Sequence, residues 1–340
     1  MEILASVKNE SPDKWAKKSV LATEKETAIL GYNSFVKHVS VILVHYNNTK
    51  TTNSCLSSLS YLIHPGYACQ YIIVDNGSIK KYVLPKSLTK SKKFKVIRSD
   101  ANLGFTGGNN LGIHNAVERY NSQYIFLLNN DTTIHKHALR NMLQTLEVQT
   151  EIGIICPKIY FSAGKEFHSK SYSTGERGKV FWYAGGIVDW QHLVAFHRGV
   201  DEVDRGQFNN AATTDYATGC AMLIRREVLE KVGFLDKRYF MYFEDVDLSL
   251  RAQKAGYTIA FCPTAIVWHD NAGSSGGSGS SLHVYYQERN RYLLAFAHGT
   301  PAVIPVVLRL QFQALTSGSR LRRKAVLDFY KGSFGKQSLI

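Results

Sequence analysis

Short apolar runs alternate with segments of helical spacing between residues 38 and 148, and this alternation restricts the fold more than any other feature of the chain. Four runs have the composition of buried strands, namely 39–44, 71–74, 94–97 and 124–128. Three segments carry apolar residues at helical spacing, namely 49–63, 109–120 and 135–148. Such alternation predicts an α/β fold with a Rossmann-like, mostly parallel sheet flanked by helices.

Polar side chains follow three of these predicted strands. Asn47 comes shortly after the first strand, Asp75 directly after the second and Asp131 after the fourth. In open parallel sheets, ligands bind beyond the carboxyl ends of the strands, where such side chains meet. The sequence therefore predicts a polar binding site at this edge of the sheet.

The second half of the chain is less regular. Its predicted elements are paired strands at 181–188 and 192–197, strands at 220–224, 258–261 and 265–268, and helices at 226–232 and 244–255. Residues 273–281 are only Gly and Ser, which is typical of a flexible linker or of a mobile loop beside a site. We divide the chain into four parts: an N-terminal extension at 1–37 with one helix around 20–30, an α/β domain at 38–272, the Gly/Ser loop at 273–281 and a helical basic segment at 282–340.

The charge of the chain is strongly positive. It has 41 basic and 27 acidic residues and a formal net charge of +14, which favours polyanionic partners. Nucleic acid fits poorly, because the basic residues cluster at the chain ends while the strand-end sites are acidic. Residues 301–340 hold seven Lys or Arg against one acid, Asp328, so we expect this segment to contact an anionic membrane surface.

Cysteine usage and hydropathy indicate where such a chain works. None of the five cysteines forms a C-x-x-C pair, which favours buried thiols in a reducing compartment. No stretch reaches the roughly 20 apolar residues of a spanning helix, and the first residues lack the apolar core of a signal peptide. We therefore expect a cytoplasmic protein, peripheral at the inner face of the membrane.

Two motifs suit a nucleotide ligand. Asp75, in the run IIVDNGS, can accept hydrogen bonds from a nucleobase or a ribose, although an Asp that begins a turn with Asn-Gly has the same appearance. Three glycines within residues 102–110 precede a predicted helix, whose first backbone amides favour anionic oxygens. An ordinary glycine-rich turn fits the second pattern equally well.

Asp131 ends the run FLLNND and suits a divalent cation. Mg²⁺ and Mn²⁺ prefer oxygen ligands and often bind only one or two protein carboxylates, with substrate phosphates completing the shell. The alternative is a helix cap ahead of residues 135–148. His269, in IVWHD, also follows an apolar strand, so it is either a metal ligand or a polar strand end.

Acidic residues gather at the predicted helix 244–255. Asp245 is placed to face a pocket and act as a general base toward an acceptor hydroxyl. Acids in a first turn also complement the helix dipole, and Glu244, Asp247 and Arg251 share one face, where they could form an exposed ion-pair stripe. Arg289 begins a later basic helix and suits a diphosphate through paired donors, or faces water.

Taken in order, these segments resemble the family 2 glycosyltransferases of the GT-A fold, and within them the rhamnosyltransferase-like enzymes of bacterial surface-polysaccharide assembly. The matching pieces span residues 38–292: VSVILVHYNN, YIIVDNGS, NLGFTGGNN, YIFLLNNDT, YATGCAMLIRREVLEKVGFLD, MYFEDVDLSLRAQKAGY, IVWHD and YYQERNRY. No single piece is specific, but the ordered set is.

The resemblance implies how a nucleotide-sugar donor binds. Asp75 would contact the pyrimidine base, Asp131 would hold Mg²⁺ or Mn²⁺, and Arg289 would contact the diphosphate. His269 would be a further ligand of the metal or of the diphosphate. The remaining donor-binding residues would be Tyr46, Asn47, Asn102, Gly104, Phe105, Gly108, Asn109 and Asn130. The family's acidic metal motif is represented here by Asn129-Asn130-Asp131, which has a single carboxylate.

The resemblance also implies the reaction. Asp245 would be the catalytic base, with Glu244 beside it, in an inverting hexosyltransferase. The enzyme would move a sugar, rhamnose among the candidates, from a dTDP- or UDP-sugar to a saccharide or lipid-linked acceptor in surface-polysaccharide biosynthesis. The alternative is a partner subunit that binds nucleotide sugars without transferring them, and turnover of a bound donor distinguishes the two.

Overall fold

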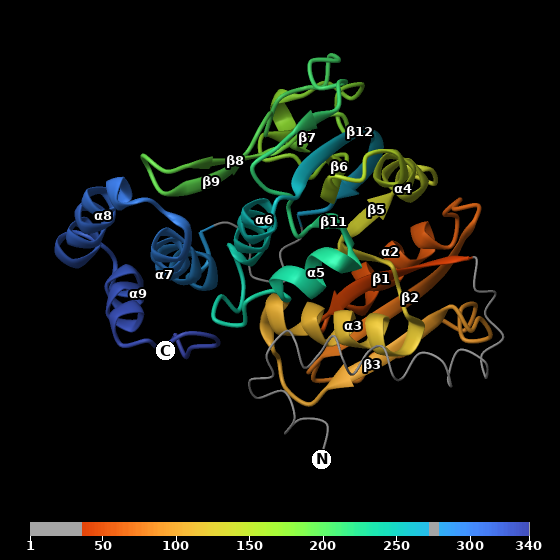
Figure 1. Ribbon diagram of the computed structural model, residues 1–340, viewed down its shortest axis with the longest axis horizontal. Coiled ribbons are helices and arrows are strands. Elements are labelled where there is room, and N and C mark those ends of the chain that lie inside the picture. The colour runs from red at the N-terminus through yellow and green to blue at the C-terminus, as the bar shows by residue number, and fades with distance from the viewer. Residues whose placement is uncertain (1–35, 272–278, 340) are drawn as a thin grey trace.

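A ten-stranded mixed sheet flanked by helices forms the centre of the computed structural model, which describes residues 36–271 and 279–339 (Figure 1). The strand order is β10 (Ala212–Thr213), β12 (Thr258–His269), β6 (Ile152–Phe161), β11 (Ala221–Arg225), β4 (Tyr124–Leu128), β1 (Lys37–His45), β2 (Tyr67–Asn76) and β3 (Phe94–Ser99). Strands β4, β1, β2 and β3 are parallel to one another, whereas β11 runs antiparallel to both β4 and β6. The predicted α/β fold with a mostly parallel sheet is confirmed.

Two short strands extend this sheet, and a hairpin stands apart from it. The added strands are β5 (Thr132–Ile134), which pairs with β12, and β7 (Phe181–Tyr183), which pairs with β6. The hairpin consists of β8 (Gly186–Asp189) and β9 (Val194–His197). The helices beside the sheet are α2 (Thr49–Leu59), α3 (Gly104–Tyr120), α4 (Ala138–Val148), α5 (Arg226–Val232) and α6 (Glu244–Lys254). A short 3₁₀ turn, η2, covers Ser169–Ser171.

The core lies between the parallel strands and the helices that cover them. Val39, Val41, Ile42 and Leu43 of β1 are fully buried. A parallel strand covered on both faces buries both sets of its side chains, which is why its sequence is continuously apolar. All five cysteines are buried with free thiols, so the predicted burial is confirmed.

Several elements differ from the sequence-based prediction, and β6 and β12 differ most. No strand is predicted at 152–161, yet these residues form β6, all ten of them buried, because Gly153, Pro157 and Lys158 interrupt its apolar pattern. The predicted strands 258–261 and 265–268 are one strand, β12, with an irregularity between Cys262 and Ile266.

The C-terminal helices lie together at the left of Figure 1, beyond α6. They are α7 (Ser281–His298), the 3₁₀ turn η3 (Pro301–Val303), α8 (Ile304–Thr316) and α9 (Arg320–Tyr330). Tyr292, Val307 and Val326 belong to the small apolar core that these helices share. In the part of the chain that the structure describes, no helix has both the length and the apolar character to cross a membrane. The helix predicted around 20–30 and most of the Gly/Ser loop lie outside the described residues.

Candidate active site

The parallel register brings the first polar strand ends to one edge of the sheet. His45 at the end of β1 is the register partner of Asp75 in β2, and Tyr46 and Asn47 follow directly. Beyond β4, the Asn130 amide donates to Thr52 Oγ1 at 2.8 Å, and that oxygen lies 2.7 Å from His45 Nδ1. The predicted residues from three strands are thus neighbours, and α2 ties two of the strand ends together.

Asp75 is buried and its carboxylate is already well supplied with donors. Its oxygens accept from the backbone N–H groups of Ser78 at 3.2 Å and Tyr82 at 3.0 Å and from the Arg98 guanidinium. Burial raises the pKa of Asp75, but these hydrogen bonds outweigh it and hold the pKa below its ordinary value. Sequence reasoning missed Arg98, because only the register between β2 and β3 places it opposite Asp75.

The glycine-rich run has a different structure from the one predicted. It is not a loop ahead of a helix at 109 but the first turns of α3, which begins at Gly104. Gly104 has φ = +74°, and a Cβ there would lie 2.4 Å from Phe240 O. A Cβ at Gly108 would lie 2.9 Å from Val44 Cγ1. These glycines therefore allow close packing of α3 against β1 and against the loop around Phe240, which precedes α6.

Two asparagines fix the start of α3. The Asn102 side-chain oxygen accepts from Gly104 N at 2.8 Å and from the Asn76 amide at 3.2 Å. Asn76, which sequence reasoning did not single out, also accepts from Leu103 N at 3.0 Å. One turn along, the Asn109 amide donates to Phe105 O at 2.9 Å. Asn102 and the first residue of α3, Gly104, are consequently held to the end of β2.

Phe105 connects this edge to the start of α6. Gly219 lies between the two regions, since a Cβ at this position would be 3.0 Å from Phe105 Cε1 and 3.5 Å from Asp245 Cβ. The Gly219 N–H donates to Asp245 Oδ2 at 2.8 Å. The fold thus places the predicted base beside the glycine-rich helix, although 140 residues of sequence separate Phe105 from Asp245.

The carboxyl groups at the start of α6 have raised pKa values. Burial raises the pKa of Asp245, against the opposing hydrogen bonds of the Gly219 and Val246 backbone. Burial and the neighbouring Asp245 hold the pKa of Glu244 well above its ordinary value. Glu244 is buried, and its Oε2 has no hydrogen-bond partner among residues 36–271 and 279–339. A carboxyl group whose pKa lies closer to neutrality is better matched to accepting a proton.

The alternative of an exposed ion-pair stripe on α6 is right about the Asp247–Arg251 pair and wrong about its exposure. Asp247 is buried and accepts from Arg251 at 2.8 Å and from His298 Nε2 at 2.8 Å. These partners outweigh burial and hold the pKa of Asp247 below its ordinary value. His298 belongs to α7, so this pair joins the helix of the candidate base to the C-terminal helices.

The loop before α6 is strained. Phe240, Tyr242 and Phe243 have φ values of +65°, +67° and +71°, which bulky residues rarely adopt. The buried Asn290 amide of α7 donates to three carbonyls of this loop, those of Tyr239, Met241 and Tyr242, at 2.8–3.0 Å. Residues from α7 therefore stabilise the backbone conformation from which Asp245 projects.

Arg289 has a structural surrounding that its sequence context did not predict. It is fully buried, and its guanidinium donates to the carbonyls of Arg238, Tyr239, Ser333 and Gly335 at 2.9–3.3 Å. Its remaining hydrogen bonds go to the Asn290 side chain. The N–H groups of Arg289 are therefore occupied by the loop before α6 and by the C-terminal turn, and we do not include Arg289 in the proposed binding site of the nucleotide sugar.

Asp131 and His269 meet because β5 pairs with β12. The register places Thr132 opposite His269, and His269 Nε2 lies 3.1 Å from Asp131 Oδ1. Trp182 packs edge-on against the imidazole with ring centroids 4.5 Å apart. His269 Nδ1 is buried and has no hydrogen-bond partner in the described part of the chain. Sequence reasoning missed Trp182, which lies in a strand with no motif around it.

The chemistry of this pair fits a divalent cation that keeps open positions. One carboxylate and one imidazole are acceptable ligands for Mn²⁺, and substrate phosphates or waters can complete such a shell. Among the described residues, no group of three or more His, Cys, Asp or Glu side chains forms a self-sufficient metal site. A cation at this position would therefore depend on ligands that the donor brings.

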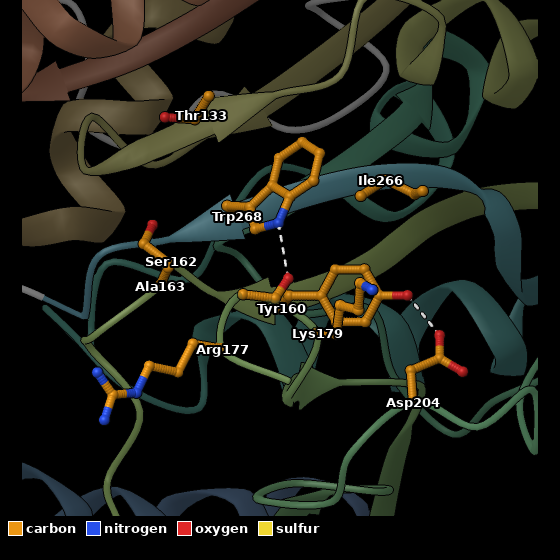
Figure 2. Close-up of a pocket in the computed structure, with 10 residues that line it drawn as sticks. Thr133, Tyr160, Ser162, Ala163, Arg177, Lys179, Asp204, Ile266 and Trp268 are labelled. Carbon is orange, nitrogen blue, oxygen red and sulfur yellow. Dashed lines mark hydrogen bonds between the residues drawn. The ribbon is translucent and has the colours of Figure 1, made fainter. Parts of the chain in front are cut away.

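A pocket of about 700 Å³ opens beside Trp268, the residue of β12 that precedes His269 (Figure 2). Tyr160, Trp268 and Asp204 line it, and the Trp268 indole donates to Gly178 O at 3.0 Å. Because side chains alternate along a strand, Trp268 points to the opposite side from His269. This pocket is therefore separate from the Asp131–His269 pair, and Asp204 in it is already paired with Lys158 at 2.7 Å.

Comparison with known proteins gives consistent results. The family model described as "Glycosyltransferase like family 2" matches residues 37–294. The low-salt glycan biosynthesis hexosyltransferase Agl10 of Haloferax volcanii is 27% identical over 255 residues, which are 75% of this chain and 74% of Agl10. An N-acetylglucosaminyl-diphospho-decaprenol L-rhamnosyltransferase of Mycobacterium tuberculosis is 40% identical over 78 residues, 23% of this chain and 25% of that enzyme.

Solved structures share the fold. The crystal structure of GalNAc-T7 with UDP, GalNAc and Mn²⁺ matches with a TM-score of 0.58 at 16% identity, over 88% of this chain and 57% of that one. At this identity the similarity concerns the fold alone. This chain thus spans little more than half the length of the GalNAc-T7 chain.

Proposed function

We propose that this chain, which belongs to glycosyltransferase-like family 2, moves a hexose from a nucleotide diphosphate sugar to a saccharide hydroxyl with inversion at the anomeric carbon. The observation that carries this proposal is the position of Asp245. Its carboxylate is oriented by the Gly219 N–H, its pKa is raised by burial, and Phe105 of the glycine-rich helix lies beside it.

In the proposed reaction, Asp245 accepts the proton of the acceptor hydroxyl as that oxygen bonds to the anomeric carbon. The bond from this carbon to the diphosphate oxygen breaks, and the nucleoside diphosphate leaves with the electron pair. Attack opposite the leaving group inverts the configuration. A positioned general base of this kind contributes about 10²–10⁴-fold to the rate. Glu244 lies beside Asp245. While it holds its proton, it adds no second negative charge next to the proposed base.

The donor nucleotide would occupy the edge formed by β1, β2 and α3. An ionised carboxylate has about four acceptor sites. Three donors already contact Asp75, which leaves capacity for one N–H of a pyrimidine base. Asn47, Asn102 and Phe105 border the same edge.

Asp131 and His269 would hold a Mg²⁺ or Mn²⁺ ion. When bound, the cation would neutralise the charge of the donor diphosphate. The open ligand set described above supports this assignment, and the related fold of GalNAc-T7 was solved with UDP and Mn²⁺.

We infer the transferred sugar and the acceptor from the names of two relatives. The names of the mycobacterial relative and of WbbL from Escherichia coli, which is 26% identical over 178 residues, both specify rhamnosyl transfer. They favour a dTDP- or UDP-linked rhamnose or related hexose as donor. The mycobacterial name also specifies a lipid-linked acceptor, which supports a glycan or lipid-linked acceptor for this chain. We propose that transfer takes place at the inner face of the cell membrane.

The proposal is tested by a thermal-shift screen of nucleotide sugars with and without Mn²⁺, followed by a transfer assay with every donor that raises the melting temperature. We expect a subset of dTDP- or UDP-sugars to stabilise the protein, more so with Mn²⁺, and to be consumed when an acceptor is present. Tight donor binding with no turnover on any glycan or lipid-linked acceptor would identify a non-catalytic partner subunit instead.

A further inference from the structure

The α8 helix exposes an unusual amount of apolar surface. Ile304, Leu308, Phe312 and Leu315 are all exposed, Phe312 to 68%. Their spacing of four, four and three residues puts them along one side of the helix, and we call these four side chains the apolar ridge. A second face, with Val307 and Ala314, packs into the helical core. The helix is therefore apolar on two sides, and the core accounts for only one of them.

Neighbouring exposed groups extend this surface onto α9. The Tyr330 hydroxyl donates to Gln311 Oε1 of α8 at 2.7 Å, so this 61% exposed tyrosine lies directly beside α8. Scattered exposed apolar residues are normal on proteins, but a contiguous group of large ones marks an interaction surface.

Cations border the apolar ridge. Arg309 of α8 and Arg320 and Arg323 of α9 are exposed, and no acidic side chain of residues 36–271 or 279–339 forms an ion pair with them. Arg320 and Arg323 occupy the first turn of α9, where the helix dipole disfavours positive charge. The one acid of this segment, Asp328, is already paired with Lys324 at 2.6 Å. The surface therefore combines apolar side chains with uncompensated positive charge.

We propose that the apolar ridge docks this protein on an anionic lipid bilayer, with α8 lying in the membrane interface and the flanking arginines contacting headgroup phosphates. Helices that lie in the interface combine an apolar side with basic residues and insert only to the level of the headgroups. Anionic headgroups complement the arginines, and the acyl region accommodates Leu308 and Phe312. A second protein copy would bring its own arginines to the same contact, which disfavours self-association.

This docking surface is connected to the candidate base. The α7 helix packs against α9 and holds the strained loop before Asp245 through Asn290. A membrane contact at α8 and α9 would thus fix the distance of Asp245 from the lipid surface. This last step rests on the proposed transfer to a lipid-linked acceptor, whereas the docking itself does not.

The test is co-sedimentation of the full chain with vesicles of phosphatidylcholine alone or with 30% phosphatidylglycerol. We expect binding to the anionic vesicles only. The double variant Leu308→Ser/Phe312→Ser should weaken it by at least about tenfold, because two large apolar groups no longer insert. The variant Arg309→Gln/Arg320→Gln/Arg323→Gln should lose most of the salt-sensitive part of the vesicle binding. The control Ile79→Ser removes a still more exposed apolar side chain outside the ridge and should not change vesicle binding.

Two outcomes would overturn the docking proposal. One is vesicle binding that is the same in the Leu308→Ser/Phe312→Ser variant as in the wild type, at unchanged melting temperature. The other is a dimer in analytical ultracentrifugation that this variant dissociates, without vesicle binding by either protein. Transfer to a short water-soluble acceptor is measured in parallel, and we expect it to be unchanged in the variant. Loss of transfer in all proteins, with docking intact, would contradict only the proposed function.

Discussion

The fold shifts the pKa of two groups of carboxyl side chains in opposite directions: Asp75 at the end of β2, and Glu244 and Asp245 at the start of α6. Both regions remove carboxyl groups from water, which by itself raises the pKa. Asp75 receives a guanidinium and two backbone N–H groups, and its pKa falls. Burial raises the pKa of Glu244, and the neighbouring Asp245 raises it further. Burial acts in the same direction in both regions, so the presence of donors at Asp75 and the weaker compensation at Asp245 and Glu244 decide the sign of each pKa shift.

This difference separates two tasks within one site. The strand-end region maintains a fixed negative charge that orders the loop after β2. In the proposed reaction, the α6 region supplies Asp245, whose protonation changes as it accepts a proton. The four predictions below test this division, beginning with the largest expected effect.

Replacement of the proposed base should have the largest effect. In Asp245→Asn, we expect kcat to fall about 10²–10⁴-fold, because no group accepts the acceptor proton, while the donor Kd stays nearly constant. Since the base must be ionised and its pKa is raised, wild-type kcat/KM should decrease as the pH falls through that pKa. Steady-state transfer assays and calorimetry of donor binding measure both, with the exposed Glu151→Gln as control. Near-normal turnover in Asp245→Asn would remove this residue as base.

The Asp131–His269 pair should show the next largest effect. In Asp131→Asn or His269→Gln, we expect donor affinity in Mn²⁺ to fall by at least about 10–100-fold, the loss that even outer-shell changes at metal sites cause. EDTA should reduce wild-type transfer, and added Mn²⁺ should restore it. Binding of Mn²⁺ together with the nucleoside diphosphate can be followed by electron paramagnetic resonance. Transfer that persists fully in EDTA would contradict a metal at this pair.

Asp75→Asn should destabilise the protein. Removal of a buried charge that accepts three hydrogen bonds, one of them from Arg98, should cost about 2–3 kcal/mol at neutral pH. Because the folded-state pKa is lowered, this stabilisation is present above the unfolded Asp pKa of about 3.9 and is lost as the pH falls through the lower folded value. Urea unfolding at several pH values measures this. An equal loss in the exposed Asp100→Asn would show that the effect is not specific to Asp75.

The effect of Glu244→Gln on the free energy of unfolding should have the opposite sign to that of Asp75→Asn and should be the smallest of the four. The folded state holds the Glu244 proton to a higher pH than the unfolded state does, so stability declines as the pH rises above the unfolded Glu pKa of about 4.3. Glutamine removes this dependence, and we expect equal or slightly higher stability at pH 7. The same urea experiment measures it, with Glu151→Gln as the matched control. A loss as large as that of Asp75→Asn would show that Glu244 is ionised in the folded protein.

Much of the parallel half of the fold follows from local sequence. The bounds of β4 match the predicted strand, and β1, β2 and β3 extend their predicted strands by one to four residues at an end. These strands are continuously apolar because both faces are covered, so the pattern is strong. In the antiparallel half, β6 and β5 were missed. Lys158 is buried there only because Asp204, from a distant loop, neutralises it, and no local pattern contains that information.

Within the candidate site, the sequence determined which residues have the right chemistry at strand ends and helix starts: Asp75, Asp131, Asp245 and His269. Only the tertiary structure decided what each of them contacts. Strand register paired Asp75 with Arg98 and Asp131 with His269, and the packing of α7 converted Arg289 from an expected phosphate ligand into a buried support of the loop before α6. Hydrogen bonds and charge effects depend on distance in space, and residues far apart in the sequence acquire that distance only through the fold.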